Sequence, residues 1–252
     1  DTFVSFPAAN TVSVETGGNE ALRVDSGQRL LHGASSSIGL NRKIQQSGTD
    51  ASAGLSLNRF SADNGAAGFD FIKSRNATIG NNTITQNNDN LGIINFRGSD
   101  GSDLLSIAAQ IKGQVDGTPG ADDMPGRLLF STTADGADSP TTRLTIDSAG
   151  KATFTEDASI NSVNIGKGAN SVSGNTVLGE SALDAAVTGA NNTAIGNNAL
   201  TTLTSGGNNV AVGANALDAN TTANGNTAVG KDALSANQTG ATNTAVGFTS
   251  LA

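Results

Sequence analysis

A repeat with a constant interval governs the C-terminal part of this chain. The segment NTAIGNNAL begins at Asn192, and similar segments begin at four other asparagines. The asparagines stand at Asn175, Asn192, Asn209, Asn226 and Asn243, so the step is seventeen residues each time. Most side chains between them vary, whereas the interval does not. This combination indicates one structural unit stacked on copies of itself.

Each unit begins with a short alternating pattern of small and β-branched side chains, which predicts a strand with two distinct faces. The two faces are predicted to carry Val177, Ala194 and Ala211 on one side and Leu178, Ile195 and Val212 on the other. A glycine then ends the strand at a corner where a Cβ would be awkward, and a leucine four residues later re-enters the interior. The predicted corners are Gly179, Gly196, Gly213, Gly230 and Gly247, and the predicted core leucines are Leu183, Leu200, Leu217, Leu234 and Leu251.

Seventeen residues at ~3.3 Å each form a coil about 56 Å around, enough for two short strands and two corners. Coils ~4.8 Å apart would bond to one another through their backbones, which predicts a parallel β-roll, or solenoid. A one-residue insertion would push inward side chains out of register. A helical repeat fits less well, because glycine and asparagine are poor helix formers.

The preceding region reads as β structure bracketed by two hairpins, at 20–33 and 142–154, each with an aspartate-containing turn. Between them, apolar runs at 67–74, 91–101, 104–117 and 126–136 alternate with turn residues. This spacing predicts an antiparallel, β-sandwich-like domain. The run that begins at Leu104 also fits the helical period, but we predict a strand.

The composition predicts association between copies of the chain. Only 36% of the 252 residues are hydrophobic, and the chain contains no Trp or Tyr. Each coil therefore offers four or five modest apolar groups, too few for an ordinary core. Three chains side by side would bury one face of each roll, so we predict a homotrimer.

Charge and composition exclude several other functions. The net charge of −8 opposes binding to nucleic acid, and no apolar run is long enough to span a membrane. The absence of cysteine excludes disulfides and thiolate metal sites. No cofactor is predicted.

No catalytic or metal-binding residue is predicted. His32 is the only histidine and reads as a surface or interface residue. Asp116, Asp122 and Asp123 would suit calcium, but the spacing is that of turns and lacks a known calcium pattern. Without Trp or Tyr, the chain lacks the usual platforms for sugar binding, which argues against a polysaccharide-degrading enzyme. No nucleophile, phosphate-loop or zinc-protease motif occurs.

Two further sets of residues are candidate binding surfaces. A threonine follows the asparagine in most units, and such a row favours ladder stacking over ice binding because Val210 interrupts it. The row consists of Thr176, Thr193, Thr227 and Thr244. Four arginines of the first region are candidates for direct receptor contact, or else partners of neighbouring aspartates: Arg59, Arg75, Arg97 and Arg127.

The repeat NTAVGKDAL and its copies resemble those of phage fibre proteins and, more loosely, the AVG repeats of trimeric autotransporter adhesin heads. Upstream, DNLGIINFRGSDGSD, VDGTPGADDMPGRLLFSTTADG and TRLTIDSAGK are similar to segments of tail-fibre proteins of tailed phages. The resemblance implies a homotrimeric, elongated virion appendage that reaches the host surface. It assigns no catalytic or receptor-contacting residue.

We therefore predict an all-β fibre segment with a connector and hairpin at 1–33, a sandwich-like domain at 34–157 and a β-roll shaft at 158–252. Its predicted place is the virion, outside the cell, where it contributes to host attachment and is not an enzyme. Its predicted partners are further copies of itself, other tail or baseplate proteins and a host receptor. The alternatives are a bacterial trimeric surface adhesin and, less consistent with the residues, a polysaccharide-degrading tailspike. Because the last coil has no capping segment, the natural chain is expected to continue.

Overall fold

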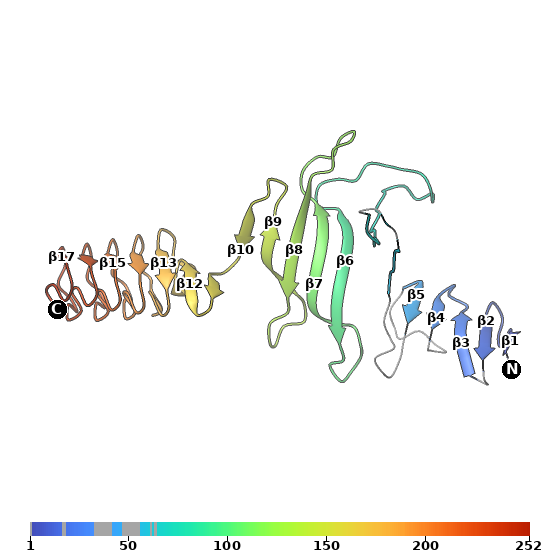
Figure 1. Ribbon diagram of the computed structural model, residues 1–252, viewed down its shortest axis with the longest axis horizontal. Helices are drawn as coiled ribbons and strands as arrows, with labels where there is room; N and C mark the ends of the chain where they lie inside the picture. The colour runs from blue at the N-terminus through green and yellow to red at the C-terminus, as the bar shows by residue number, and fades with distance from the viewer. Residues whose placement is uncertain (1, 17–18, 33–41, 47–55, 61, 63–64) are drawn as a thin grey trace. The chain divides into compact units, whose positions relative to one another are not determined.

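The computed structural model describes residues 2–16, 19–32, 42–46, 56–60, 62 and 65–252, and these consist mainly of strands and connecting turns (Figure 1). Contacts divide the chain into two units, residues 1–151 and 152–252. No helix in the described ranges is long and apolar enough to cross a membrane. The all-β prediction is confirmed.

A five-stranded sheet forms the N-terminal part. Its strands, in spatial order, are β1 (Thr2–Ser5), β2 (Val12–Thr16), β3 (Asn19–Val24), β4 (Leu30–His32) and β5 (Ile44–Gln46). The pair β3–β4 is the hairpin predicted at 20–33, with Arg23 opposite Leu31. Asp25 closes its turn, because its Oδ1 accepts hydrogen bonds from the backbone amides of Gly27 (2.9 Å) and Arg29 (3.0 Å). The predicted domain boundary between residues 33 and 34 lies outside the described residues.

A second sheet has the spatial order β10-β9-β8-β7-β6. Its strands are β6 (Asn90–Gly98), β7 (Ser106–Val115), β8 (Gly126–Thr132), β9 (Thr141–Ile146) and β10 (Ala152–Phe154). β6 to β9 pair antiparallel. β7 shows that the run beginning at Leu104 is extended, so the helical alternative is wrong. The predicted second hairpin is confirmed, with Asp147 Oδ1 accepting from the amides of Ala149 (3.0 Å) and Lys151 (2.9 Å).

Among the described residues, the strands of this region form a single five-stranded sheet, so the second layer that the sandwich-like prediction expects is not found among them. The run 67–74 forms no strand. Its Phe71 instead lies against β6, so closely that a Cβ at Gly92 would overlap the Phe71 side chain. Phe69 meets Phe71 edge to face, with ring centroids 4.9 Å apart. The alternating apolar pattern of 67–74 thus serves to cover part of a sheet face and not to build a second layer.

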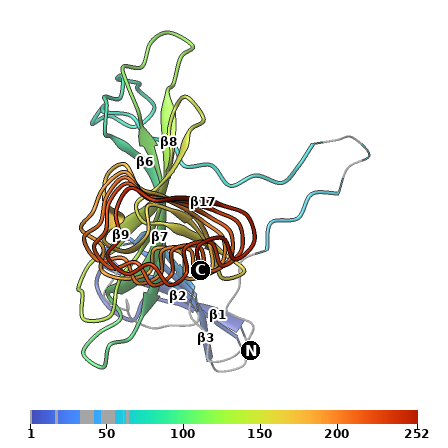
Figure 2. The same ribbon diagram turned by 90° about the vertical axis from the view of Figure 1, so that its left-hand side faces the viewer.

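The C-terminal unit is the predicted solenoid. Its repeat strands are β13 (Thr176–Gly179), β14 (Thr193–Ile195), β15 (Val210–Val212), β16 (Thr227–Val229) and β17 (Thr244–Val246). Each pairs in parallel with the next, and every partner lies seventeen residues further along the chain. Figure 2 shows the coils stacked behind one another. The seventeen-residue parallel β-roll is confirmed.

An antiparallel hairpin covers the first edge of this ladder. It consists of β11 (Ala158–Ile160) and β12 (Val163–Gly166), followed by a short 3-10 turn, η1 (Ala169–Ser171). β12 pairs with β13, placing Ile165 opposite Leu178, so that β11 to β17 form one seven-stranded sheet. The hairpin therefore occupies backbone groups that would otherwise be an open strand edge. The repeats alone do not predict this arrangement.

The solenoid core lies on the inner face of the repeat strands. Buried there are Val177, Ala194, Ala211, Ala228 and Ala245. The alternation predicts two opposite faces, and the structure shows that the second one points outward: Leu178 is 43% exposed and Val246 is 69% exposed.

Candidate functional site

The predicted corner glycines lie where successive coils approach most closely. Four of them, Gly196, Gly213, Gly230 and Gly247, have φ between 126° and 137°, a region that side chains with a Cβ rarely adopt. A Cβ on Gly213 would also overlap the carbonyl oxygen of Gly230 in the next coil. At Gly247 the nearest atom to such a Cβ would be 3.9 Å away. The glycines therefore permit both the corner and the close stacking of coils.

The predicted core leucines are buried in four coils and exposed in the fifth. Leu183, Leu200 and Leu217 are fully buried, Leu234 is 3% exposed and Leu251 is 65% exposed. All five have a left-handed backbone, with φ from 48° to 53°, which the sequence reasoning missed. This conformation costs a leucine roughly 1–2 kcal/mol, whereas burial of its side chain contributes about 1.5–3 kcal/mol. Burial outweighs the strain and turns the chain inward.

The asparagines that mark the repeat form a buried ladder. Asn175 is 5% exposed, and Asn192, Asn209 and Asn226 are fully buried. Each Oδ1 accepts a hydrogen bond from the backbone amide of the asparagine one coil later, at 2.8 Å from Asn192, 3.0 Å from Asn209, 2.9 Å from Asn226 and 2.8 Å from Asn243. In the sequence these asparagines mark only the interval of the repeat, and nothing in the pattern indicates that they are buried.

The side-chain amides of the same asparagines complete the ladder. Asn192 Nδ2 donates to the carbonyl of Gly206 at 2.9 Å, and Asn209 Nδ2 donates to that of Ala223 at 2.9 Å. Each rung therefore joins three backbone segments, two of them in the next coil. A buried polar network is stabilising when its members are satisfied and costly when they are not. This explains why asparagine recurs without substitution in every unit.

A second, partly exposed row runs along the coils at Asn198, Asn215 and Asp232. Asn198 Nδ2 donates to Asn215 Oδ1 at 3.2 Å, and Asn215 Nδ2 donates to Asp232 Oδ1 at 2.9 Å. Hydrogen bonds from Lys231 and Asn215 lower the pKa of Asp232. Burial raises the pKa of Asp218, whose Oδ1 is buried without a hydrogen-bond partner.

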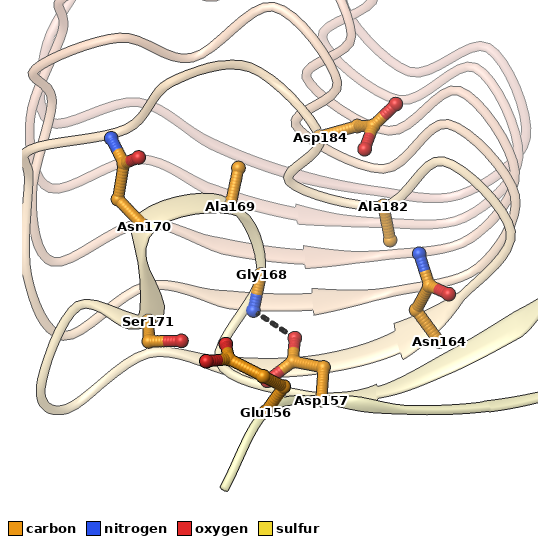
Figure 3. Close-up of a pocket in the computed structure, with 9 residues that line it drawn as sticks. All are labelled: Glu156, Asp157, Asn164, Gly168, Ala169, Asn170, Ser171, Ala182 and Asp184. Carbon is orange, nitrogen blue, oxygen red and sulfur yellow. Dashed lines mark hydrogen bonds between the residues drawn. The ribbon is translucent and has the colours of Figure 1, made fainter. Parts of the chain in front are cut away.

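A hollow of about 550 Å³ lies beside the first coil (Figure 3). Its lining includes Glu156 and Asp157, with Asp184 further from them (Figure 3). Asp157 is already engaged, since it accepts hydrogen bonds from the amides of Lys167 (2.8 Å) and Gly168 (2.6 Å). The amide of Ala169 in turn donates to the Leu183 carbonyl at 3.1 Å. These contacts fasten the connection after β12 to the first coil.

The acidic turns of the first unit hold the backbone. Asp116 accepts from Arg127 at 2.8 Å and from the amide of Ser148 at 2.9 Å, and its pKa is lowered mainly by the latter bond. Asp123 closes a turn with Gly120. In the ranges that the structure describes, no three His, Cys, Asp or Glu residues are grouped as metal ligands. His32 is exposed at the end of β4.

The four arginines make contacts within the chain. Arg75 binds Asp89 through two hydrogen bonds of 2.6 and 2.7 Å, and this pairing lowers the pKa of Asp89. Arg127 pairs with Asp116, and Arg97 donates to the Leu105 carbonyl. Arg59 lies against Gly65, where a Cβ would overlap its guanidinium. Arg75 and Arg127 thus pair with aspartates, which is the alternative to receptor contact that the sequence offered.

The threonine row is regular and outward-facing. Thr176 pairs with Thr193, Val210 with Thr227, and Thr227 with Thr244 in the parallel ladder. The next outward position on each strand is aliphatic. The outward sheet face therefore has one largely threonine row and one aliphatic row.

Comparison with known proteins identifies phage fibre structures as similar. No protein-family model and no curated protein matches the sequence. A structure of the carboxy-terminal domain of the bacteriophage T5 L-shaped tail fibre is similar at 18% identity and a TM-score of 0.42, covering 62% of this chain and 70% of that one. A structure of the same domain with its intra-molecular chaperone domain has 17% identity and a TM-score of 0.47, covering 62% of this chain and 48% of that one. In both comparisons the match covers less than two thirds of this chain.

Proposed function

We propose that this chain is a structural and adhesive segment of a phage tail fibre, which projects from the virion and contributes to attachment at the host surface. The observation that carries the proposal is the in-register stack of coils joined by the buried asparagine ladder. Each coil is bonded to its neighbours through backbone and side chain together. Such a stack resists bending and local opening, and a fibre shaft between the virion and the host surface needs this stiffness.

The fibre is proposed to be a homotrimer. In the second sheet, Ile94, Phe96 and Leu128 are 45%, 52% and 45% exposed in the single chain. Ile94 and Phe96 share a face of β6, because side chains two residues apart lie on the same side of a strand. That face, together with the outward face of the solenoid, leaves apolar surface for further copies of the chain to cover.

The proposed role is mechanical and includes no catalysis. Asp157, which lines the hollow beside the first coil together with Glu156 and Asp184, is held by two backbone amides. Release of reducing sugar from bacterial polysaccharides by the purified chain would overturn this part of the proposal. Partners in the virion would be other tail or baseplate proteins, and the external partner would be a host receptor.

Binding to bacterial cells tests the attachment role. Fluorescently labelled full-length chain should bind a susceptible strain saturably, and excess unlabelled chain should compete. The same chain should delay adsorption of the phage that carries it. A chain that shows neither saturable binding nor competition on that strain would contradict the adhesive role.

A bacterial trimeric adhesin would share the rod and the adhesive role. The two proposals differ in where the chain is found. Antibody against the purified chain should label virions if the fibre proposal is right, whereas labelling of the surface of uninfected bacteria would support the adhesin.

A further inference from the structure

One asparagine of the solenoid is followed directly by a glycine. The chain contains two Asn–Gly pairs, at 64–65 and 224–225. The first begins outside the described residues, and the second lies between β15 and β16. Asn224 and Gly225 are both exposed. In the repeat region this pair alone places an asparagine side chain beside a following amide that carries no Cβ.

An Asn–Gly pair carries the groups of a self-modification reaction. The backbone nitrogen of Gly225 attacks Cγ of Asn224, a new C–N bond forms, and the Cγ–Nδ2 bond breaks. Ammonia leaves with the proton that the backbone nitrogen gave up, and a succinimide ring remains. Water then opens the ring at one of its two carbonyls. Opening at Cγ yields aspartate, whereas opening at the backbone carbonyl yields isoaspartate, whose main chain runs through Cβ and Cγ.

The other asparagines of the coils are followed by bulkier residues. The four buried members of the ladder each precede a threonine or a valine: Asn175, Asn192, Asn209 and Asn226. The exposed Asn208 precedes Asn209. A following side chain, above all a β-branched one, crowds the attacking nitrogen and restricts its backbone, whereas glycine does neither. The residue at 225 therefore singles out Asn224.

The folded coil holds both reacting groups in hydrogen bonds. Asn224 Oδ1 accepts from the amide of Gly207 at 2.7 Å, and the amide of Gly225 donates to the Gly207 carbonyl at 3.1 Å. The Asn224 carbonyl accepts from the amide of Thr242 at 3.0 Å. The preceding coil thus engages the attacking nitrogen and the side chain, and the next coil engages the backbone. Ring closure requires this segment to open locally, as hydrogen exchange of the same amide does.

The two products differ in how they fit the coil. Aspartate keeps an oxygen that can accept from the Gly207 amide, and a charged acceptor strengthens such a bond. Isoaspartate instead adds one atom to the main chain just before Gly225. The next ladder amide, that of Asn226, reaches Asn209 Oδ1 at 2.9 Å, and an added atom displaces it from this acceptor.

We propose that Asn224 is a site of spontaneous deamidation, that the hydrogen bonds between coils set its rate, and that its isoaspartate product keeps the coil from closing again. Each local opening gives the reaction a chance, so the modified fraction is a lasting record of how often this coil opens. The inference goes beyond the fibre role and does not depend on it, because it concerns the chemistry of one coil.

Peptide mapping by mass spectrometry measures the reaction at each asparagine. The purified full chain is kept in a mildly alkaline buffer, once folded and once in urea, and deamidation at Asn224 is followed with time. In urea, Asn224 should react much faster than Asn208. In the folded chain it should react about thirtyfold more slowly than in urea, since two hydrogen bonds of ordinary strength must open.

Three results of this measurement would overturn the inference. The first is an equal rate at Asn224 in the folded chain and in urea, because the coil would then exert no control. The second is a folded chain in which Asn208 reacts as fast as Asn224, because glycine would then not select the site. The third is an Asn224 that stays intact in the folded chain over a time that the expected ratio makes sufficient.

A variant of the ladder tests whether coil opening controls the rate. Asn209 Nδ2 donates to the carbonyl of Ala223, the residue before Asn224, at 2.9 Å. Asn209→Ala should therefore speed deamidation at Asn224 in the folded chain about fivefold and leave the rate in urea unchanged. The matched control is Asn197→Ala, whose lost bond to the Glu180 carbonyl is 3.4 Å long, and it should change the rate less than about twofold. Equal acceleration by both variants would contradict control by the ladder.

The products are tested separately. Asn224→Asp supplies the aspartate product in pure form and should keep Tm within about 2 °C of the wild type. Ion exchange separates the deamidated folded chain, which carries one more negative charge, and its isoaspartate form should show faster hydrogen exchange in peptides spanning β15 and β16. Exchange at the wild-type rate would overturn the effect on coil closure. Failure of the chain to bind cells would contradict the attachment role and leave all these rates unchanged.

Discussion

The solenoid and the second sheet solve the problem of strand register in different ways. In the solenoid, every strand pairs with a copy of itself seventeen residues away, and a buried asparagine fixes the offset at each step. In the sheet β6–β10, neighbouring strands differ in sequence, and turns such as that at Asp147, between β9 and β10, set their offset. Both regions expose apolar side chains, but the solenoid also has a buried core of its own on the inner face of its strands.

This difference predicts where each region is fragile. An error in one coil is transmitted to its neighbours, because the ladder requires the same offset above and below. An error in a connecting turn of the sheet stays local, since loop length costs little free energy. The variants below test this contrast, beginning with the largest expected effect.

A one-residue insertion should separate the two regions most clearly. Inserting alanine between Val210 and Ala211 would turn inward side chains outward and break the ladder at Asn226. The free energy of unfolding should fall by more than about 4 kcal/mol, which lowers Tm by ~10 °C or more. Thermal unfolding followed by circular dichroism measures this change.

The control for this variant is an alanine inserted between Asp135 and Gly136, in the exposed turn between β8 and β9. It should change Tm by only about 2 °C. If the two insertions lowered Tm equally, a register error in the solenoid would not spread to neighbouring coils more than an error in a turn of the sheet does.

Corner glycines separate backbone strain from coil stacking. Gly213→Ala and Gly247→Ala have similar positive φ, but only at Gly213 does the added Cβ meet the backbone of a following coil. We expect Gly247→Ala to cost about 1–2 kcal/mol of unfolding free energy and Gly213→Ala about 3–5 kcal/mol. Denaturant unfolding gives both values, and their difference reports the stacking contribution. Gly98→Ala in the sheet, where no atom lies within 4 Å of the new Cβ, should be nearly neutral.

The asparagine ladder predicts an intermediate effect. Asn209→Ala removes the acceptor of the buried Asn226 amide, and an unsatisfied buried donor costs about 1–3 kcal/mol. The exposed Asn197, whose side chain makes only a 3.4 Å bond to the Glu180 carbonyl, is the matched control and should change stability by less than about 0.5 kcal/mol. If Asn197→Ala destabilised as much as Asn209→Ala in denaturant unfolding, the ladder would not be a main source of cohesion.

Acid should loosen the first unit before the solenoid. Hydrogen bonds lower the pKa of Asp89, mainly from Arg75, and that of Asp100 to about 2, mainly from the Ser102 amide. Since unfolded aspartate has a pKa of about 3.9, the stability that these groups contribute is present above that value. It is lost as the pH falls through their folded pKa values.

The pKa shift of Asp218 in the solenoid is opposite in sign to those of Asp89 and Asp100. Burial raises its folded pKa, so its penalty is relieved as the pH falls through that raised value. Hydrogen exchange followed by mass spectrometry and corrected for intrinsic rates measures this order. As the pH falls from about 5 to about 2, the range that these pKa values set, peptides around Asp89 and Asp100 should lose protection at a higher pH than peptides of the solenoid coils. Earlier loss in the coils would contradict this order.

Much of the architecture could be predicted because its information is local or periodic. The interval between asparagines gave the coil length and the parallel pairing, and the aspartate-containing turns gave both hairpins. The apolar spacing of the β7 segment fits both the strand and the helix period, and the structure decides for the strand that we predicted. The segment at 67–74 could not be placed, because an alternating apolar pattern is the same whether a chain pairs at a sheet edge or lies on a sheet face. Phe71 against Gly92 decided that question.

The sequence by itself determined the seventeen-residue register, since only a strict stack of coils requires a constant interval between units whose side chains differ. It also determined that neighbouring strand residues lie on opposite faces, because alternation fixes the side of every residue, whereas the structure shows that the face of Val177, Ala194 and Ala211 is the inner one. Only the tertiary structure decided that the marker asparagines are buried, that Leu200 and its counterparts adopt left-handed backbone, and that β11–β12 covers the first edge. These features depend on the environment that neighbouring coils create, where burial outweighs the intrinsic preferences of asparagine for water and of leucine for negative φ.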